Sequence, residues 1–187
     1  MAEIDVLLGD PSLAKKELKD ASNRSDSPEL VIPIARTFAI LADDANAQGI
    51  LARQQNARQQ QGLDYGAAKY FIDGIEALRK SDFQKATEQL TLSSRMHQSP
   101  ETTYFLAKAQ MGEHDWVGAI ESLNSLVENR ARVFTESVAS LIPLAEHDLS
   151  ICYSSEGRGP EARQHLETAQ KIWEGADPSL KALLKGR

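Results

Sequence analysis

The chain has 187 residues, of which 41% are hydrophobic and 26% are charged, and its formal net charge is −6. This composition is typical of a globular protein, and the acidic balance disfavours a general phosphate-binding surface, so we expect no nucleic-acid partner. No apolar run approaches the roughly 18 residues of a membrane span, and the first residues, Met1 to Asp5, lack the basic and apolar regions that are typical of a signal peptide. The single cysteine, Cys152, cannot form an internal disulfide. We therefore expect a cytoplasmic protein without membrane association.

Helix start signals recur along the chain, and no segment alternates between apolar and polar residues as a strand does. Five of the seven prolines follow Asp, Ser or Gly where a helix is expected to begin: Pro11, Pro28, Pro100, Pro160 and Pro178. In chain order the signals predict helices over about 11–21, 28–41, 43–62, 64–80, 81–96, 100–111, 115–128, 160–173 and 179–184. The fold class is therefore expected to be all-α.

Two prolines conflict with this pattern. Pro33 lies inside the expected helix 28–41, where it lacks an N–H group and clashes with the preceding turn, so we expect a kink or a late start. Pro143 is expected to kink or divide the stretch 130–155, which is too long for one ordinary helix. At the next boundary, Ser81 is expected to cap the helix that follows it, with Gln84 completing a capping box.

A fixed period organises the chain. Ala86 and Ala119 stand 33 residues apart, and each has an Asp four residues before it and a Leu four residues after it. The Ala–Leu pair occurs five times, at the anchor alanines Ala14, Ala47, Ala86, Ala119 and Ala162. The intervals are 33, 39, 33 and 43 residues, and Arg158 replaces the Asp before the last anchor. Intervals of this size are the signature of a repeat array.

The helix before each anchor follows a matching rule. Twelve residues before the four later anchors stand the small residues Ala35, Gly74, Ala107 and Ser150. Two helices approach closely where a small residue on one faces a small residue on the other, while larger apolar residues fill the groove beside them. We therefore expect each unit to be a hairpin of two helices, with the anchor alanine in the second.

At these positions the chain resembles the tetratricopeptide repeat (TPR) family, whose 34-residue unit follows the pattern W-x2-L-G-x2-Y…A-x3-F…P. The resemblance covers about residues 3–174, with Leu in place of the family's Phe and Asp73 at a position that is usually Leu. It implies a right-handed α-solenoid of about five units in a single domain over 1–187. The implied repeats are 3–27 (partial), 28–63, 64–99, 100–129 and 130–176, followed by a short capping helix over 177–187.

The C-terminal part resembles the closing repeat of bacterial multidomain TPR proteins. In those proteins a helix ends in Trp and is followed by an Ala-Asp-Pro turn and a short capping helix, a pattern that Trp173, Ala176, Asp177 and Pro178 match. Such arrays often follow a winged-helix DNA-binding domain or a serine/threonine kinase domain. The first unit would need residues before Met1, so we expect the chain to be the C-terminal part of a larger bacterial regulatory protein.

The resemblance also implies a partner-binding groove lined by the first helix of each unit. By the family's geometry this groove would present Phe71, Ile75, Leu78, Tyr104, Lys108, Met111 and His147. An apolar and aromatic groove suits an extended peptide or a partner helix. The alternative for Phe71, Ile75, Leu78 and Met111 is packing against a neighbouring repeat. We expect a non-catalytic scaffold for a protein or peptide, including another domain of the parent chain, without cofactor or metal.

A second hypothesis is a sensor or an enzyme with a small-molecule pocket near Asp73, Tyr104 and His147. It rests on two polar residues, Asp73 and His147, at positions where core or groove residues are often apolar. The four histidines lack metal-ligand spacing, and no Gly-rich phosphate loop follows a strand. The carboxylates are scattered over the helix surfaces, so no acid–base pair can be nominated. The sequence therefore favours the scaffold.

Overall fold

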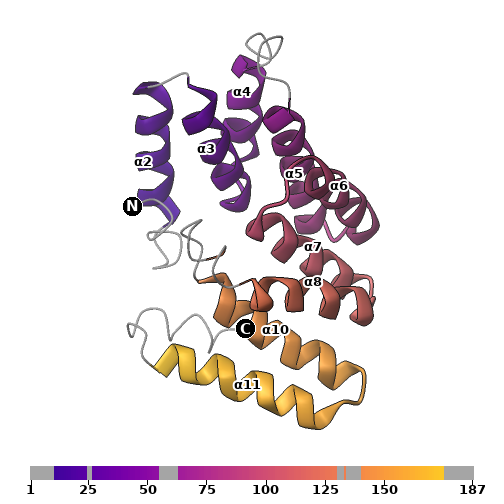
Figure 1. Cartoon of the computed structure of the whole chain (residues 1–187). Coiled ribbons are helices and arrows are strands. Elements are labelled where there is room, and N and C mark those ends of the chain that lie inside the picture. The colour runs from indigo at the N-terminus through magenta and orange to yellow at the C-terminus, as the bar shows by residue number, and fades with distance from the viewer. Residues whose placement is uncertain (1–10, 25–26, 55–62, 130–132, 134–139, 175–187) are drawn as a thin grey trace.

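The computed structural model describes residues 11–24, 27–54, 63–129, 133 and 140–174. These residues are almost entirely helical and contain no strand, which confirms the all-α prediction (Figure 1). The helices are α2 (Pro11–Arg24), α3 (Pro28–Ile40), α4 (Asp44–Gln54), α5 (Leu63–Arg79), α6 (Phe83–Met96), α7 (Pro100–Gly112), α8 (Trp116–Glu128), α10 (Leu141–Ser155) and α11 (Gly159–Glu174). Among them, none combines the length and the apolar character that crossing a membrane requires.

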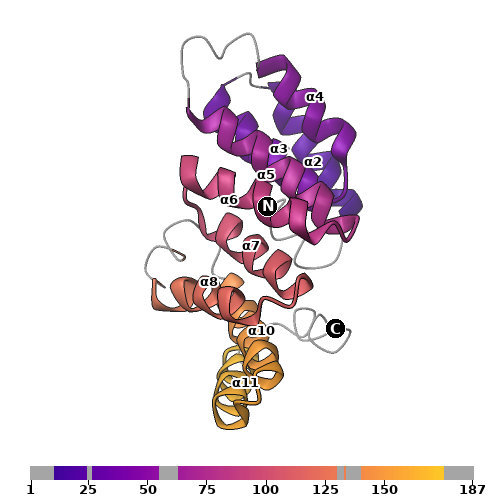
Figure 2. The same ribbon diagram turned by 90° about the vertical axis from the view of Figure 1, so that its right-hand side faces the viewer.

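The helices pack in neighbouring pairs. The pairs are α3 with α4, α5 with α6, α7 with α8, and α10 with α11, and they follow one another in a row in both Figure 1 and Figure 2. We refer to α3, α5, α7 and α10 as the first helices and to α4, α6, α8 and α11 as the second helices. The first helices contact one another in succession, and α4, α6 and α8 each also contact the first helix of the next pair.

The turn inside each pair has the same backbone form. One residue of each turn has a left-handed backbone conformation. Its φ is 57° at Ala42, 58° at Ser81, 61° at His114 and 72° at Gly157. The next residue donates its N–H to the carbonyl five residues earlier, as Asp43 does to Phe38 at 2.9 Å and Arg158 does to Tyr153 at 2.8 Å. This is a Schellman motif, which ends a helix. The four turns are spaced 39, 33 and 43 residues apart, like the anchor alanines that follow them.

An Asp caps the second helix after each of the first three turns. The carboxylates of Asp43, Asp82 and Asp115 accept the N–H of the residue three positions later, at 3.3, 3.3 and 3.0 Å. The prediction that Ser81 caps α6 is wrong, because Ser81 is the left-handed residue of the turn and Asp82 takes the capping position. In the fourth turn the guanidinium of Arg158 instead pairs with Glu161.

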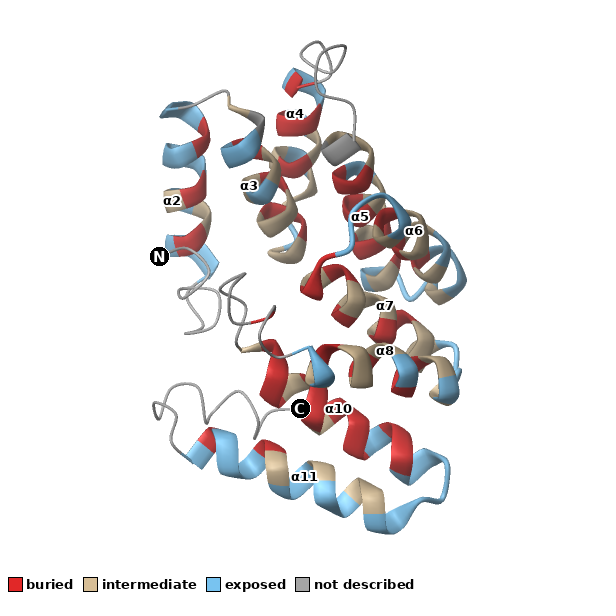
Figure 3. Cartoon of the chain, in the orientation of Figure 1, coloured by how far each residue is buried: buried red, intermediate tan, exposed pale blue. Residues whose placement is uncertain are grey.

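Four of the five anchor alanines lie in the core. Ala14, Ala47, Ala86 and Ala119 are fully buried, and the leucines four residues after them are buried as well. Gly74 is buried too, and a Cβ added to it would lie only 2.7 Å from Cγ of Leu90. The last unit differs, since Leu166 is exposed on α11, the last helix of the described chain, which lies at one end of the row (Figure 3).

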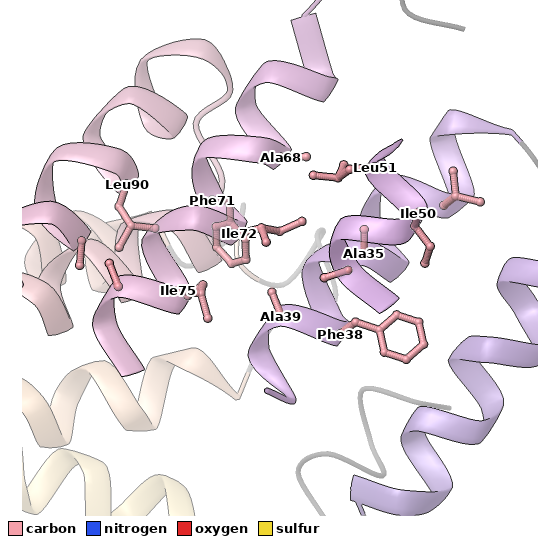
Figure 4. Close-up of a cluster of buried hydrophobic side chains, with 14 of the residues drawn as sticks. Ala35, Phe38, Ala39, Ile50, Leu51, Ala68, Phe71, Ile72, Ile75 and Leu90 are labelled. Atoms are coloured by element: carbon pink, nitrogen blue, oxygen red, sulfur yellow. The ribbon is translucent and has the colours of Figure 1, made fainter. Parts of the chain in front are cut away.

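The apolar core consists of two clusters that adjoin at α7. The first extends from α2 to α7, and Figure 4 shows its centre, where Phe71 and Ile72 of α5 lie between Leu90 on one side and Leu51 on the other. The second cluster joins α7, α8 and α10. Phe105 of α7 packs against both clusters. Helix α7 therefore couples the two halves of the core.

The two prolines that conflict with the helix pattern are accommodated differently. Helix α3 begins at Pro28 and continues through Pro33, so the expected late start is wrong. Pro143 lies in the first turn of α10, where its missing N–H group removes no intrahelical hydrogen bond. The predictions for residues 3–10, 55–62 and the capping segment 177–187 lie outside the described residues.

Candidate partner-binding face

A continuous line of side-chain contacts crosses the four first helices. The guanidinium of Arg36 on α3 lies over the ring of Phe71 on α5, 4.2 Å from its centroid. Phe71 packs edge-on against Phe105 of α7, which packs edge-on against Tyr104, with ring centroids 5.9 and 5.5 Å apart. The Tyr104 hydroxyl donates to the Asp148 carboxylate on α10 at 3.0 Å. We call these five residues the first-helix line.

Arg36 ends the line on the side of α3. Its NH2 group donates to Oγ of Ser99 at 2.7 Å and to Oγ1 of Thr102 at 3.2 Å. The carboxylate of Glu101 lies 3.8 Å from the same nitrogen. Ser99 is itself the N-cap of α7 and accepts the backbone N–H of Thr102. Arg36 therefore reaches from the first pair of helices to the start of the third.

Asp148 ends the line on the side of α10 and is almost fully buried. Its Oδ2 accepts hydrogen bonds from Tyr104 and from Nζ of Lys108, both at 3.0 Å, and Nδ1 of His147 lies 3.7 Å from Oδ1. Burial raises the pKa of this carboxyl, but the contact with His147, the charge and hydrogen bond of Lys108 and the hydrogen bond of Tyr104 together outweigh burial. The pKa of Asp148 is therefore below its ordinary value of 3.8.

An ionised Asp148 positions two side chains at the surface. The Lys108 side chain is 31% exposed and that of His147 is 24% exposed, whereas the carboxylate between them is 5% exposed. Each retains hydrogen-bonding capacity beyond its contact with Asp148, because an ammonium group carries three donors and an imidazole has two nitrogens. The buried carboxylate thus orients both groups without being available to a ligand itself.

The predicted groove residues divide into buried and open ones. Phe71, Ile75 and Tyr104 are buried, so the prediction that they form an exposed groove is corrected: they belong to the core. Buried Phe71 and Ile75 agree with the alternative of packing against a neighbouring unit. Leu78 and Met111 are half-buried, at the edges of the first and second core clusters.

Partly exposed polar side chains lie at the two ends of the first-helix line. At one end, Arg36 and Glu101 are partly exposed beside the buried Thr102. At the other, Lys108 and His147 are partly exposed beside the buried Asp148. Two predicted site residues, Lys108 and His147, are therefore brought together at Asp148. Two others are buried beneath the surface, where Phe71 contacts Arg36 and Tyr104 donates to Asp148.

Sequence reasoning missed the buried acids of α10. Glu146 and Asp148 are 2% and 3% exposed, and neither was singled out. Glu146 meets Nδ1 of His165 on α11 at 2.7 Å, and the His165 ring stacks on that of Tyr153. The available signal was two carboxylates among the many apolar residues of this helix. Because a buried charge is costly without a partner, such residues call for a search for donors on neighbouring helices.

The proposed small-molecule residues do not meet in one pocket. Asp73 is half-buried and interacts with Gln48 of α4, at 3.4 Å, and with Lys69 one turn earlier, whereas Tyr104 and His147 meet at Asp148. A hollow of about 130 Å³ lies between the start of α7 and the end of α8. It is lined by Gln98, Ser99, Pro100, Thr103, Ser125, Leu126, Asn129 and Val133. None of the three proposed pocket residues contributes to it.

The described residues include a single cysteine, and their potential metal ligands are spread apart. Within the described ranges, no three His, Cys, Asp or Glu side chains lie close enough together to hold a metal ion. Cys152 is fully buried, and burial together with the nearby charge of Asp148 raises the pKa of its thiol to about 11. A neutral, enclosed thiol is a poor nucleophile, so Cys152 acts as a small core residue.

No family model, no curated protein and no solved structure matches this chain.

Proposed function

We propose that the chain is a non-catalytic scaffold that holds a peptide or helical segment of a partner protein against the face of α3, α5, α7 and α10. The observation that carries this proposal is the first-helix line, which joins all four first helices and has partly exposed polar side chains beside both of its ends. A face that extends across several stacked hairpins suits a long, thin ligand better than a compact one.

The arrangement of the pairs supports a TPR-like solenoid as the architecture behind this face. Four hairpins share one turn geometry, and their first helices contact one another in succession. In repeat proteins of this kind, stacking the units produces an extended binding surface. We further propose a cytoplasmic setting in which the partner is another protein or another domain of a larger bacterial regulatory protein.

The open side chains of the face are fixed before any partner arrives. Arg36 is held by two hydroxyl groups and an aromatic ring, and Lys108 by the buried carboxylate of Asp148. Long cationic side chains normally lose rotamer freedom on binding, at about 0.5–1.5 kcal/mol each. Donors that are already ordered avoid part of this loss when they bind carbonyl or carboxylate oxygens of a partner.

Selection from a displayed peptide library, followed by affinity measurements on variants, tests this proposal. Lys108→Ala and His147→Ala are expected to weaken selected peptides by about tenfold or more, which is about 1.4 kcal/mol. Lys85→Ala on α6 and Glu121→Ala on α8 are matched controls, because both residues are exposed on second helices. Peptides whose affinity responds only to the control variants would place the binding surface elsewhere.

A further inference from the structure

Arg36 makes a contact that a simple stack of hairpins does not require. In a repeat array each unit contacts its immediate neighbours. Arg36 belongs to the first pair, α3 and α4, yet its hydrogen-bond partners Ser99 and Thr102 are 63 and 66 residues away at the start of the third pair. The side chain passes over Phe71 of the second pair on its way. One residue therefore contacts three successive pairs.

The geometry of the contact suits a guanidinium group better than an ammonium group. Cζ of the Arg36 guanidinium lies over the Phe71 ring, 4.2 Å from its centroid, while the NH2 group donates to two hydroxyl oxygens and approaches the Glu101 carboxylate. A lysine ammonium lacks both the plane that stacks on a ring and the fork of donors. Thr102 and Ser99 are 0% and 3% exposed. Their buried hydroxyl groups depend on protein partners, since water has little access to them.

The contact restrains the relative position of two helix pairs that are separated by a third pair. It joins α3 directly to the N-terminal turn of α7, and α7 is the helix at which the two core clusters adjoin. Between α3 and α7, the only first helix is α5, whose Phe71 is enclosed between Arg36 and Phe105. A restraint between the first and third pairs limits how far they can separate by small rotations at the two intervening interfaces.

We propose that Arg36 is a strap that sets the angle between the first and third helix pairs, so that releasing it lets the row of first helices open. The strap consists of Arg36 and its contacts Phe71, Ser99, Glu101 and Thr102. It is a property of the chain alone and holds whether or not the proposed partner binds. Loss of the strap lengthens the distance between α3 and α8 while leaving each hairpin folded.

Distances between spin labels on the full chain test the strap. Labels are placed at Glu29→Cys on α3 and Glu121→Cys on α8, both exposed positions, in a Cys152→Ala background. Arg36→Met keeps most of the aliphatic stem and removes every donor. It is expected to shift the distance distribution beyond the wild-type spread toward longer values. An unchanged distribution in folded Arg36→Met would overturn the proposal.

Arg79→Met is the matched control. Arg79 of α5 also joins helices of different pairs, through the carbonyl of Ala39 and the carboxylate of Asp44, but these lie in the adjacent pair. It is expected to leave the label distance within the wild-type spread, and an equal lengthening in this control would overturn a specific role for Arg36. If Arg36→Met loses its helical circular dichroism, Arg36→Lys is measured instead. A longer distance in Arg36→Lys supports the strap, and a wild-type distance contradicts it.

Discussion

The hydroxyl of Tyr104 on α7 donates a hydrogen bond to the carboxylate of Asp148 on α10, 44 residues further along the chain. Both side chains are buried, and Lys108 donates to the same carboxylate oxygen. The contact joins the first helices of two neighbouring pairs through a charged acceptor. It explains how a tyrosine with almost no exposed surface contributes to the proposed partner-binding face: it helps to fix the carboxylate that orients Lys108 and His147.

Tyr104→Phe is expected to lower the free energy of unfolding by about 1.5–3 kcal/mol, because a hydrogen bond to a buried charged acceptor is lost while the ring is retained. Urea denaturation followed by circular dichroism measures this change. Tyr70→Phe on α5 is the matched control, since Tyr70 is only half-buried, and its loss is expected to stay within about 0.5 kcal/mol. Equal losses in the two variants would contradict the importance assigned to the Asp148 contact.

Asp148→Asn is expected to change how stability depends on pH. The folded-state pKa of Asp148 is below its ordinary value of 3.8, so its charge stabilises the fold fully above that value. This contribution is lost as the pH falls from 3.8 through the lower folded-state pKa. The variant is expected to be less stable than wild type at pH 7, with the difference narrowing below pH 3.8. Urea denaturation at pH 7, 4 and 3 checks this, and a difference independent of pH would contradict it.

Gly74→Ala and Gly49→Ala are expected to have opposite effects. Both glycines lie in helices, where alanine is favoured by about 1 kcal/mol. A Cβ at Gly49 meets no atom within 4 Å, so this variant is expected to stabilise the fold by about that amount. At Gly74 the Cβ would lie 2.7 Å from Cγ of the fully buried Leu90, and overpacking typically costs about 1–3 kcal/mol. Stabilisation by both substitutions in thermal melts would mean that α5 and α6 are not as close as described.

Substitutions in two of the four Schellman turns are expected to have opposite effects on stability. Gly157→Ala puts a Cβ at a φ of 72° and is expected to cost about 1 kcal/mol, although the site itself is open. Ala42→Gly removes a Cβ from a φ of 57° and is expected to stabilise by up to about 1 kcal/mol. The melting temperature of each variant reports the sign. A loss of stability in Ala42→Gly would contradict the shared turn geometry.

Much of the fold could be predicted from the sequence because its signals are local. The Ala–Leu pairs and the small residues twelve positions before them depend on spacing within one hairpin, and Ala47, Ala86 and Ala119 are buried as that spacing requires. The turn residues were harder to identify. A glycine is the usual sequence signal for a left-handed turn residue, but only one of the four positions is a glycine, Gly157. Ser81 therefore resembled a helix cap, although it is the turn residue and Asp82 is the cap.

The site was less predictable because it depends on contacts between pairs. The identities of Phe71 and Tyr104 suggested an aromatic groove, but the lateral packing of α3, α5, α7 and α10 encloses both rings. Asp148 meets Tyr104 only because α10 packs beside α7, and no spacing rule within one hairpin encodes that. The contacts of Arg36 are still harder to predict, because its partners Ser99 and Thr102 lie beyond the intervening pair of α5 and α6.

The most direct test of the proposed function is a nuclear magnetic resonance titration of the labelled chain with a peptide selected from the library. The largest chemical-shift changes are expected on Arg36, Glu101, Lys108 and His147 and on their neighbours along α3, α7 and α10. The exposed residues of α6 and α8, including Lys85 and Glu121, are expected to change little. Shift changes concentrated on those second helices, or a library without any binder, would contradict the proposed function.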